Sequence, residues 1–487
     1  MTDDLAVRPG RTLAAVALVQ FMVSLDLSVV NVGLPRIAAG LGFGAVDLTW
    51  VIHAYALTFG GLLLLGGKAA DRYGRKRILL LGLGLFGLAS LAGGFAQEPG
   101  HLVAARAVQG VGAALLAPAG LALLTATFPT GRARVRAFGT WSATNAAGGA
   151  LGVLLGGLLT EYAGWRWVMF VNVPMAACAS ALAWRGVTAG PPAARGGRPD
   201  VLGAVLATAG MTLLVFGVVR TDRYAWTSPA TLTTLTVAAA LLAAFIRVET
   251  ATTREPLLRL GLFANRSVAG ANAYTFLIGA AMTPSFYFVS LYLQQVLGTG
   301  PARTGLMFLP FALAVVTGSV LAVTFSRRLA PRTLLVVGGL LGATGLAWFG
   351  LISPGGAFLT DVLGPSIVTG AGFGLCLGPV TSLATLGVAS HETGTAAGLL
   401  NSSRQIGASI GLAVLGAAAH RRAGGTATPT TPTTLNDGYA LGLSLGAVLL
   451  AAAVLVALTV LGRSAPSARI ERTEDHDPHP ARSSGRP

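Results

Sequence analysis

The chain has 487 residues, of which 53% are hydrophobic and only 11% are charged. So few charges cannot cover the surface of a water-soluble protein of this size, and apolar runs of about 18 residues or more, each able to cross a bilayer, recur along the chain. The formal net charge of +16 does not indicate a nucleic-acid partner, because the basic residues are scattered through short loops and form no patch with interleaved aromatic residues.

The apolar runs predict fourteen transmembrane helices, which makes the chain an all-α polytopic membrane protein. An even number of spans places both termini on the same side of the membrane. The expected spans are 12–34, 48–66, 78–96, 101–127, 137–160, 167–184, 201–219, 231–247, 268–297, 303–325, 333–352, 358–388, 396–419 and 439–462.

A short basic segment between the second and third spans sets the predicted orientation. It reads GKAADRYGRKR (67–77) and carries five Lys and Arg residues around the carboxylate of Asp71. Loops this basic resist translocation, so the segment is expected on the cytoplasmic side. Most of the 34 Lys and Arg residues then also fall in cytoplasmic segments, and both termini are predicted to be cytoplasmic.

Weak internal symmetry predicts two related halves. Glycines at 148, 152 and 156 in span five are matched by Gly407 and Gly411 in span thirteen, and SRRLAPR (326–332) resembles a decayed copy of the segment 67–77. Duplicated halves of this kind are common in transporters. The predicted domains are an N-terminal six-helix bundle (1–185), a linker with two extra transmembrane helices (186–266), a C-terminal six-helix bundle (267–462) and a disordered cytoplasmic tail (463–487).

Asp26 is the one acidic residue placed near the middle of a predicted span. A charge at that depth costs at least a few kcal/mol, so such a carboxylate faces the bundle interior or a wet cavity and suits the uptake and release of a proton. The alternative is a structural aspartate that only forms hydrogen bonds. The sequence therefore makes Asp26 a candidate proton-coupling residue.

Arg106, within span four, is the basic counterpart of Asp26. Gln109 follows three residues later and shares its helix face. Arg106 could hold Asp26 ionised, or it could fix a neighbouring helix through backbone carbonyl groups. Arg404 and Gln405 lie in the first turns of span thirteen and are interpreted as contacts between helices.

The glycines of span five, Gly148, Gly152 and Gly156, form a smooth stripe that allows close approach of a neighbouring helix. Packing is the first interpretation, and gating at the same face is the second. Asn31 follows Asp26 in span one and could loosen that helix around a substrate cavity.

The sequence contains no catalytic constellation. It has no phosphate-binding GxxxxGK[ST], no GxSxG and no His/Cys cluster with metal-ligand spacing, so we expect neither an enzyme nor a metal site nor a cofactor. The two cysteines, Cys178 and Cys376, both fall inside apolar runs and are interpreted as small core residues.

Several motifs together resemble the major facilitator superfamily, and within it the fourteen-span drug:proton antiporters of the multidrug efflux type. The segment 67–77 is similar to the superfamily's signature between spans two and three. The other matching runs are LDLSVVNVGLP in span one, RAVQGVGAALLAPA in span four, GWRWVMFVNVP at the start of span six and NSSRQIGASIG in span thirteen. The resemblance implies the major facilitator fold, with two pseudo-symmetric six-helix bundles and two inserted central helices.

The resemblance also implies roles for individual residues. Asp71 would bond across the interface of the two halves and lock an outward-open state. The residues that would support this latch or permit its tight turn are Gly67, Arg72, Gly74 and Arg75. Asp26 and Arg106 would occupy the proton-coupling positions. One departure concerns export: Val153 stands where the antiporter motif of span five usually has proline.

The resulting prediction is a proton-coupled secondary transporter that exports hydrophobic or amphipathic compounds by alternating access. Its energy source would be the proton gradient, and its partners would be a small substrate, protons and the lipid bilayer of the plasma or inner membrane, with no nucleic acid and with a monomer as the working unit. The alternatives are a dedicated exporter of one metabolite or self-made antibiotic, an importer or facilitator, and a non-transporting receptor. No deeply placed acid was found in the C-terminal half, which favours neutral, monocationic or anionic substrates.

Overall fold

The computed structural model describes residues 9–44, 47–128, 131–187, 200–219, 224, 226–251, 260–326, 328–386, 388, 393–424 and 431–461. Every regular element in these ranges is a helix, as the sequence predicted. The predicted disordered tail (463–487) and most of the loop 186–200 lie outside the described residues.

The helices follow the predicted spans closely. The first seven are α1 (Pro9–Leu41), α2 (Trp50–Tyr73), α3 (Arg75–Gly94), α4 (Pro99–Thr127), α5 (Gly131–Tyr162), α6 (Arg166–Phe170) and α7 (Asn172–Gly186). The central pair is α8 (Val201–Val219) and α9 (Pro229–Ala251). The last group is α10 (Arg266–Leu291), α11 (Pro301–Met307), α12 (Leu309–Phe325), α13 (Pro331–Phe349), α14 (Gly364–Ala384), α15 (Thr393–Arg422) and α16 (Pro432–Thr459).

Four predicted spans are interrupted in the structure. The sixth is divided between α6 and α7, and the tenth between α11 and α12. The ninth ends in a π-helical turn (Tyr292–Val296), and the twelfth begins with another (Phe358–Leu363). Such interruptions are tolerated in membrane proteins where neighbouring helices satisfy the freed backbone groups.

Within the described ranges, eleven helices are long and apolar enough to cross a membrane, and α2, bent by 53° between Leu63 and Leu65, makes a twelfth if it counts as one span. The two other predicted spans correspond to α8, whose apolar part Leu202–Val218 is shorter, and α15, which has 30 residues but a more polar sequence. The chain is therefore a multi-pass membrane protein, and the number of fourteen crossings stays a prediction.

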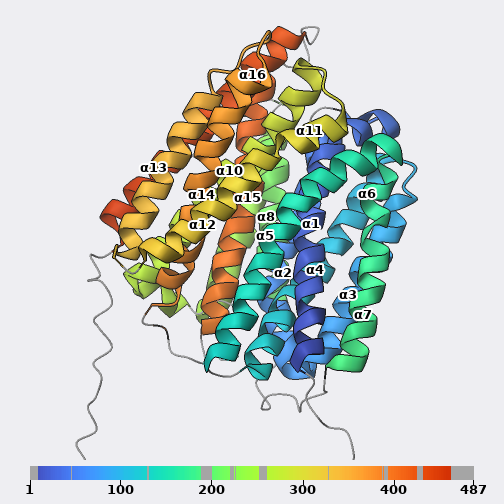
Figure 1. The fold of residues 1–487 in the computed structure, drawn as a ribbon. Coiled ribbons are helices and arrows are strands. Elements are labelled where there is room, and N and C mark those ends of the chain that lie inside the picture. The colour runs from blue at the N-terminus through green and yellow to red at the C-terminus, as the bar shows by residue number, and fades with distance from the viewer. Residues whose placement is uncertain are drawn as a thin grey trace, which may run out of the picture.

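Two groups of helices repeat the same neighbours. In the N-terminal group, α1 packs on α5 and α7, while α4 packs on α2 and α3. In the C-terminal group, α10 packs on α15 and α16, while α14 packs on α12 and α13 in the same way. Figure 1 shows the groups side by side, the first in blue to green and the second in yellow to red. A repeated arrangement of this kind is the expected product of an internal duplication.

The glycine stripes explain the closest pair in each group. A Cβ on Gly148, Gly152 or Gly156 would come within 2.6–2.8 Å of a backbone oxygen of α1. A Cβ on Gly407 or Gly411, the matching glycines of α15, would come even closer to a backbone oxygen of α10. Small residues allow two helix backbones to approach this closely.

The central pair, α8 and α9, pack on each other, and α8 also contacts α2 and α15. Since α2 belongs to the N-terminal group and α15 to the C-terminal group, α8 touches both halves. This contact positions the inserted pair at the seam between the two halves.

Candidate functional site: a buried polar cluster in the N-terminal bundle

Asp26 of α1 lies in the core of the N-terminal bundle with none of its surface exposed. Its Oδ2 atom lies 2.6 Å from Nη1 of Arg106 on α4, whose side chain is 2% exposed. The carboxylate and guanidinium thus form an ion pair away from water, where their attraction is stronger than at a surface. The structure brings these two predicted residues into direct contact.

Two side-chain amides complete the shell around the carboxylate. Nδ2 of Asn172 on α7 donates to Oδ1 of Asp26 at 2.8 Å, and Nε2 of Gln109 donates to the same oxygen at 3.3 Å. The same two nitrogens also donate to Oγ of Ser90 on α3, at 3.0 Å and 2.7 Å. Asp26 therefore receives hydrogen bonds from three side chains, those of Arg106, Gln109 and Asn172.

Arg106 is held on three further sides. Its Nε donates to the carbonyl oxygen of Val51 at 3.1 Å, and its Nη1 donates to Oε1 of Gln109 at 3.0 Å. Its guanidinium lies over the ring of Tyr55 on α2, 4.4 Å from the ring centroid, in a cation–π contact. Arg106 therefore pairs with Asp26 and also ties α4 to the backbone of α2.

The cluster joins α1, α2, α3, α4 and α7, and sequence reasoning missed three of its members. Ser90, Asn172 and Tyr55 are all fully buried. The only available signal was a polar side chain inside an apolar run, which is weaker than a charged one. Their assignment to the Asp26 site needed the helix packing.

The glycine stripe of α5 packs on the segment of α1 that carries Asp26. Gly148 packs on the backbone of Phe21, Gly152 on Leu25 and Gly156 on Val29, so the stripe follows α1 on both sides of Asp26. The packing interpretation of these glycines agrees with these contacts. Val153 is buried, and a Cβ on Gly305 of α11 would lie 2.8 Å from the carbonyl oxygen of Val153.

We predict that Gly152→Ala destabilises the protein by about 1–3 kcal/mol and slows transport, because the added Cβ would lie 2.8 Å from the carbonyl oxygen of Leu25. Gly149→Ala is the matched control on the same helix, since its Cβ meets nothing closer than Oγ of Ser28 at 3.8 Å. Thermal unfolding in detergent and efflux rates would measure both effects. Equal behaviour of the two variants would contradict the packing argument.

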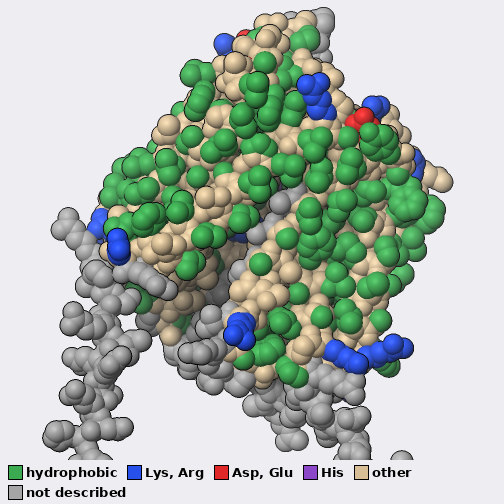
Figure 2. All heavy atoms as spheres, in the orientation of Figure 1, with side chains coloured by type: hydrophobic (Ala, Val, Ile, Leu, Met, Phe, Trp, Pro, Cys, Tyr) green, Lys and Arg blue, Asp and Glu red, His purple; other side chains and the backbone are tan. Residues whose placement is uncertain are grey.

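The two halves also meet at the end of the bundle where α1 and α5 terminate, the upper end in Figure 1. Oγ of Ser290 donates to the carbonyl oxygen of Asn31 at 3.2 Å, and Nε2 of Gln294 donates to that of Val32 at 3.0 Å. Oε2 of Glu161 on α5 accepts from the backbone N–H of Ala302 at the start of α11, at 2.7 Å. Below these contacts the surface is hollowed between the halves (Figure 2).

Asn31 is therefore separate from the Asp26 cluster. Its side-chain nitrogen donates to the carbonyl oxygen of Leu27 in its own helix, at 2.8 Å. Its backbone carbonyl is the part that reaches the other half. The predicted cavity-lining role of its side chain stays a prediction.

The predicted latch lies around the C-terminal end of α2. Asp71 is largely exposed, and its Oδ1 lies 3.7 Å from Nη2 of Arg75, while Arg72 stacks over the ring of Tyr73. Only Gly74 turns the chain, with a φ of +96° that L side chains rarely adopt, whereas Gly67 lies inside α2. The turn is thus shorter than the sequence suggested, because α2 continues to Tyr73.

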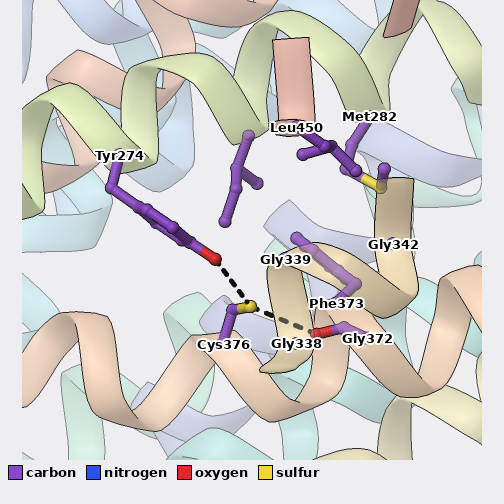
Figure 3. A pocket seen from close by; sticks show the side chains of 10 residues that line it. Tyr274, Met282, Gly338, Gly339, Gly342, Gly372, Phe373, Cys376 and Leu450 are labelled. Carbon is purple, nitrogen blue, oxygen red and sulfur yellow. Dashed lines mark hydrogen bonds between the residues drawn. The ribbon is translucent and has the colours of Figure 1, made fainter. Parts of the chain in front are cut away.

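A small cavity of about 10 Å³ lies in the C-terminal group, far along the chain from the polar cluster. It is lined by glycines of α13 and α14, by Cys376 and by Tyr274, whose hydroxyl lies 3.1 Å from Sγ of Cys376 (Figure 3). This space is large enough for about one water molecule and too small for an organic substrate.

The family model of the Major Facilitator Superfamily matches residues 16–412. The chain is 41% identical over 451 residues to the cephamycin export protein CmcT of Amycolatopsis lactamdurans, covering 92% of each chain. It is 38% identical over 474 residues to the puromycin resistance protein pur8 of Streptomyces alboniger, covering 95% of this chain and 92% of that protein. The methylenomycin A resistance protein of Bacillus subtilis is 32% identical over 413 residues, covering 84% and 87%.

Solved transporter structures have the same fold at low sequence identity. The nucleoside transporter NupG superposes with a TM-score of 0.65 at 12% identity, covering 93% of this chain and 99% of that one. A bacterial homologue of the human lysosomal transporter Spinster, in an inward-facing and unoccupied conformation, gives 0.65 at 16% identity, covering 94% and 98%.

Proposed function

The chain belongs to the major facilitator superfamily, and from this premise we propose that it is a proton-coupled secondary transporter that exports hydrophobic or amphipathic compounds, antibiotics among them. The observation that carries the proposal is the sealed ion pair of Asp26 and Arg106 inside the N-terminal bundle. Ionisable groups at such depth in a membrane bundle are the usual elements of proton relays.

The names of the relatives support the direction of transport. One relative is an export protein, and two others are resistance proteins for different antibiotics. The basic segment 67–77 supports a cytoplasmic position for the lower end in Figure 1, in a plasma or inner membrane. We propose that one chain is the working unit.

In this orientation the upper contacts between the halves would close the outer side. Asn31, Val32 and Glu161 of the N-terminal half would then seal the exit, and substrate would enter from the cytoplasm. The Asp71 latch, which the family resemblance assigns to the outward-open state, would be released. Alternating access would follow from rocking of the two groups about the seam.

Proton coupling would act through the Asp26 cluster. Three side chains donate hydrogen bonds to the carboxylate while the cluster is sealed from solvent. Protonation of Asp26 from the outer side would remove its charge and weaken the bond to Arg106. Because Arg106 also ties α4 to α2, a change at the carboxylate would reach the helices that pack at the seam.

A dedicated exporter of one metabolite is the second candidate, and the cephamycin exporter among the relatives favours it. Both candidates are tested by expressing the protein in a host that lacks its own drug pumps and measuring efflux of ethidium, cephamycin and puromycin. We expect efflux that stops when a protonophore collapses the gradient. Efflux of one compound alone would favour the dedicated exporter, and efflux that persists without a gradient would contradict proton coupling.

A further inference from the structure

Arg404 lies inside α15, about three turns after the first residue of that helix, and no carboxylate neutralises it within the part of the chain that the structure describes. Its Nη2 donates to Oδ1 of Asn401, one turn earlier on α15, at 2.9 Å. The side chain is half-buried, in contrast to the fully paired Arg106. An interior cation without a counter-ion is costly and marks a functional site by default.

Two buried polar groups on α2 and α15, which pack on each other, have no hydrogen-bond partner among the described residues. The hydroxyl of Tyr55 on α2 is fully buried and has no hydrogen-bond partner among the described atoms, while the ring of Tyr55 contacts the guanidinium of Arg106. The next residue, Gln405, is 3% exposed, packs on Gly60 of α2, and leaves its Nε2 without an acceptor. A guanidinium carries five N–H donors, and the hydrogen bond that Arg404 donates among the described residues uses one of them, so an anion can supply the missing acceptors.

The duplication gives this arginine a polar counterpart in the N-terminal half. Arg404 lies three residues before Gly407, as Asn145 lies three residues before Gly148 in the equivalent helix α5. Asn145 is exposed, and its Oδ1 accepts hydrogen bonds from Gln20 and Ser24 of α1, at 2.7 Å and 2.5 Å. The N-terminal half thus presents a neutral polar group where the C-terminal half presents a charge.

We propose that Arg404 binds an anionic group, a carboxylate in the simplest case, of the transported compound. This inference rests on the proposed transport function and adds a substrate class to it. A guanidinium can hold a carboxylate through two parallel N–H···O bonds. The sequence indicated only a contact between helices for Arg404, and the proposal adds substrate binding to that role.

The test uses the purified full-length protein and a matched pair of probes, benzylpenicillin and its methyl ester, which differ in one negative charge. Binding is measured by ligand-dependent thermal stabilisation in detergent. We expect the acid to bind the intact protein better than the ester, and Arg404→Gln to weaken binding of the acid by about tenfold or more with little change for the ester. Arg404→Lys keeps the charge but loses the two parallel hydrogen bonds, so it should retain only part of the preference. Arg328→Gln, at an exposed arginine of the same half, should leave it unchanged.

Equal affinity of the intact protein for the acid and the ester would overturn the inference without any variant. An equal loss of binding for both compounds in Arg404→Gln would also overturn it. Gradient-driven uptake into inside-out vesicles, measured with labelled benzylpenicillin and with ethidium, tests the transport function separately. Uptake by the intact protein, together with equal binding of the acid and the ester, would reject the anion site and leave the transport function standing. An Arg404-dependent preference without gradient-driven uptake would leave the anion site standing and reject proton-coupled transport.

Discussion

Asp26→Asn is expected to reduce proton-driven efflux to the background of cells that lack the protein. The substitution keeps the shape of the side chain but removes the group that would carry the proton, and no other acid lies in the described polar cluster. Exchange of labelled for unlabelled substrate, which needs no net proton movement, should continue. Ethidium efflux and substrate exchange, measured at equal expression, separate the loss of coupling from a loss of folding.

Asp437→Asn is the matched control, because Asp437 is an exposed residue of α16. It should leave both efflux and exchange unchanged. If Asp26→Asn drives efflux as well as the intact protein does, Asp26 is a structural hydrogen-bonding residue and the proposed coupling is wrong.

The second large effect is expected for Arg106→Gln. Removing the guanidinium would leave Asp26 buried without its counter-ion and would also remove the hydrogen bond to Val51 and the contact with Tyr55. Breaking a buried ion pair on one side typically destabilises a protein by about 3–5 kcal/mol. We therefore expect a clear fall in the thermal unfolding midpoint in detergent.

The double variant Asp26→Asn with Arg106→Gln should recover much of this stability, because it leaves no buried charge uncompensated, but it should not recover proton-driven efflux. Arg166→Gln serves as the control, since Arg166 is exposed and its Nη2 donates to the carbonyl oxygen of Ala96 at 3.2 Å. That change should affect stability by about 0.5 kcal/mol or less. Additive losses in the double variant would show that the two side chains do not act as a pair.

Much of the candidate site could be predicted because its strongest members are charged. Asp26 and Arg106 stand out in apolar runs, and the three-residue spacing places Gln109 on the face of Arg106, where Nη1 indeed reaches its Oε1 at 3.0 Å. The latch was predicted less well. Its glycines looked alike in sequence, but only Gly74 adopts a left-handed conformation, whereas Gly67 continues α2.

The sequence by itself determined the class of the protein, the positions of its helices, the glycine stripes and the acid in span one, because apolar run length, helical periodicity and the cost of a buried charge are local properties. Only the tertiary structure decided which helices meet. It brings Asn172 to Asp26 across 146 residues of chain and places Arg106 over Tyr55, and among the described residues it gives Arg404 no carboxylate partner. A local pattern encodes which face of a helix is buried, but it does not encode which neighbour covers that face.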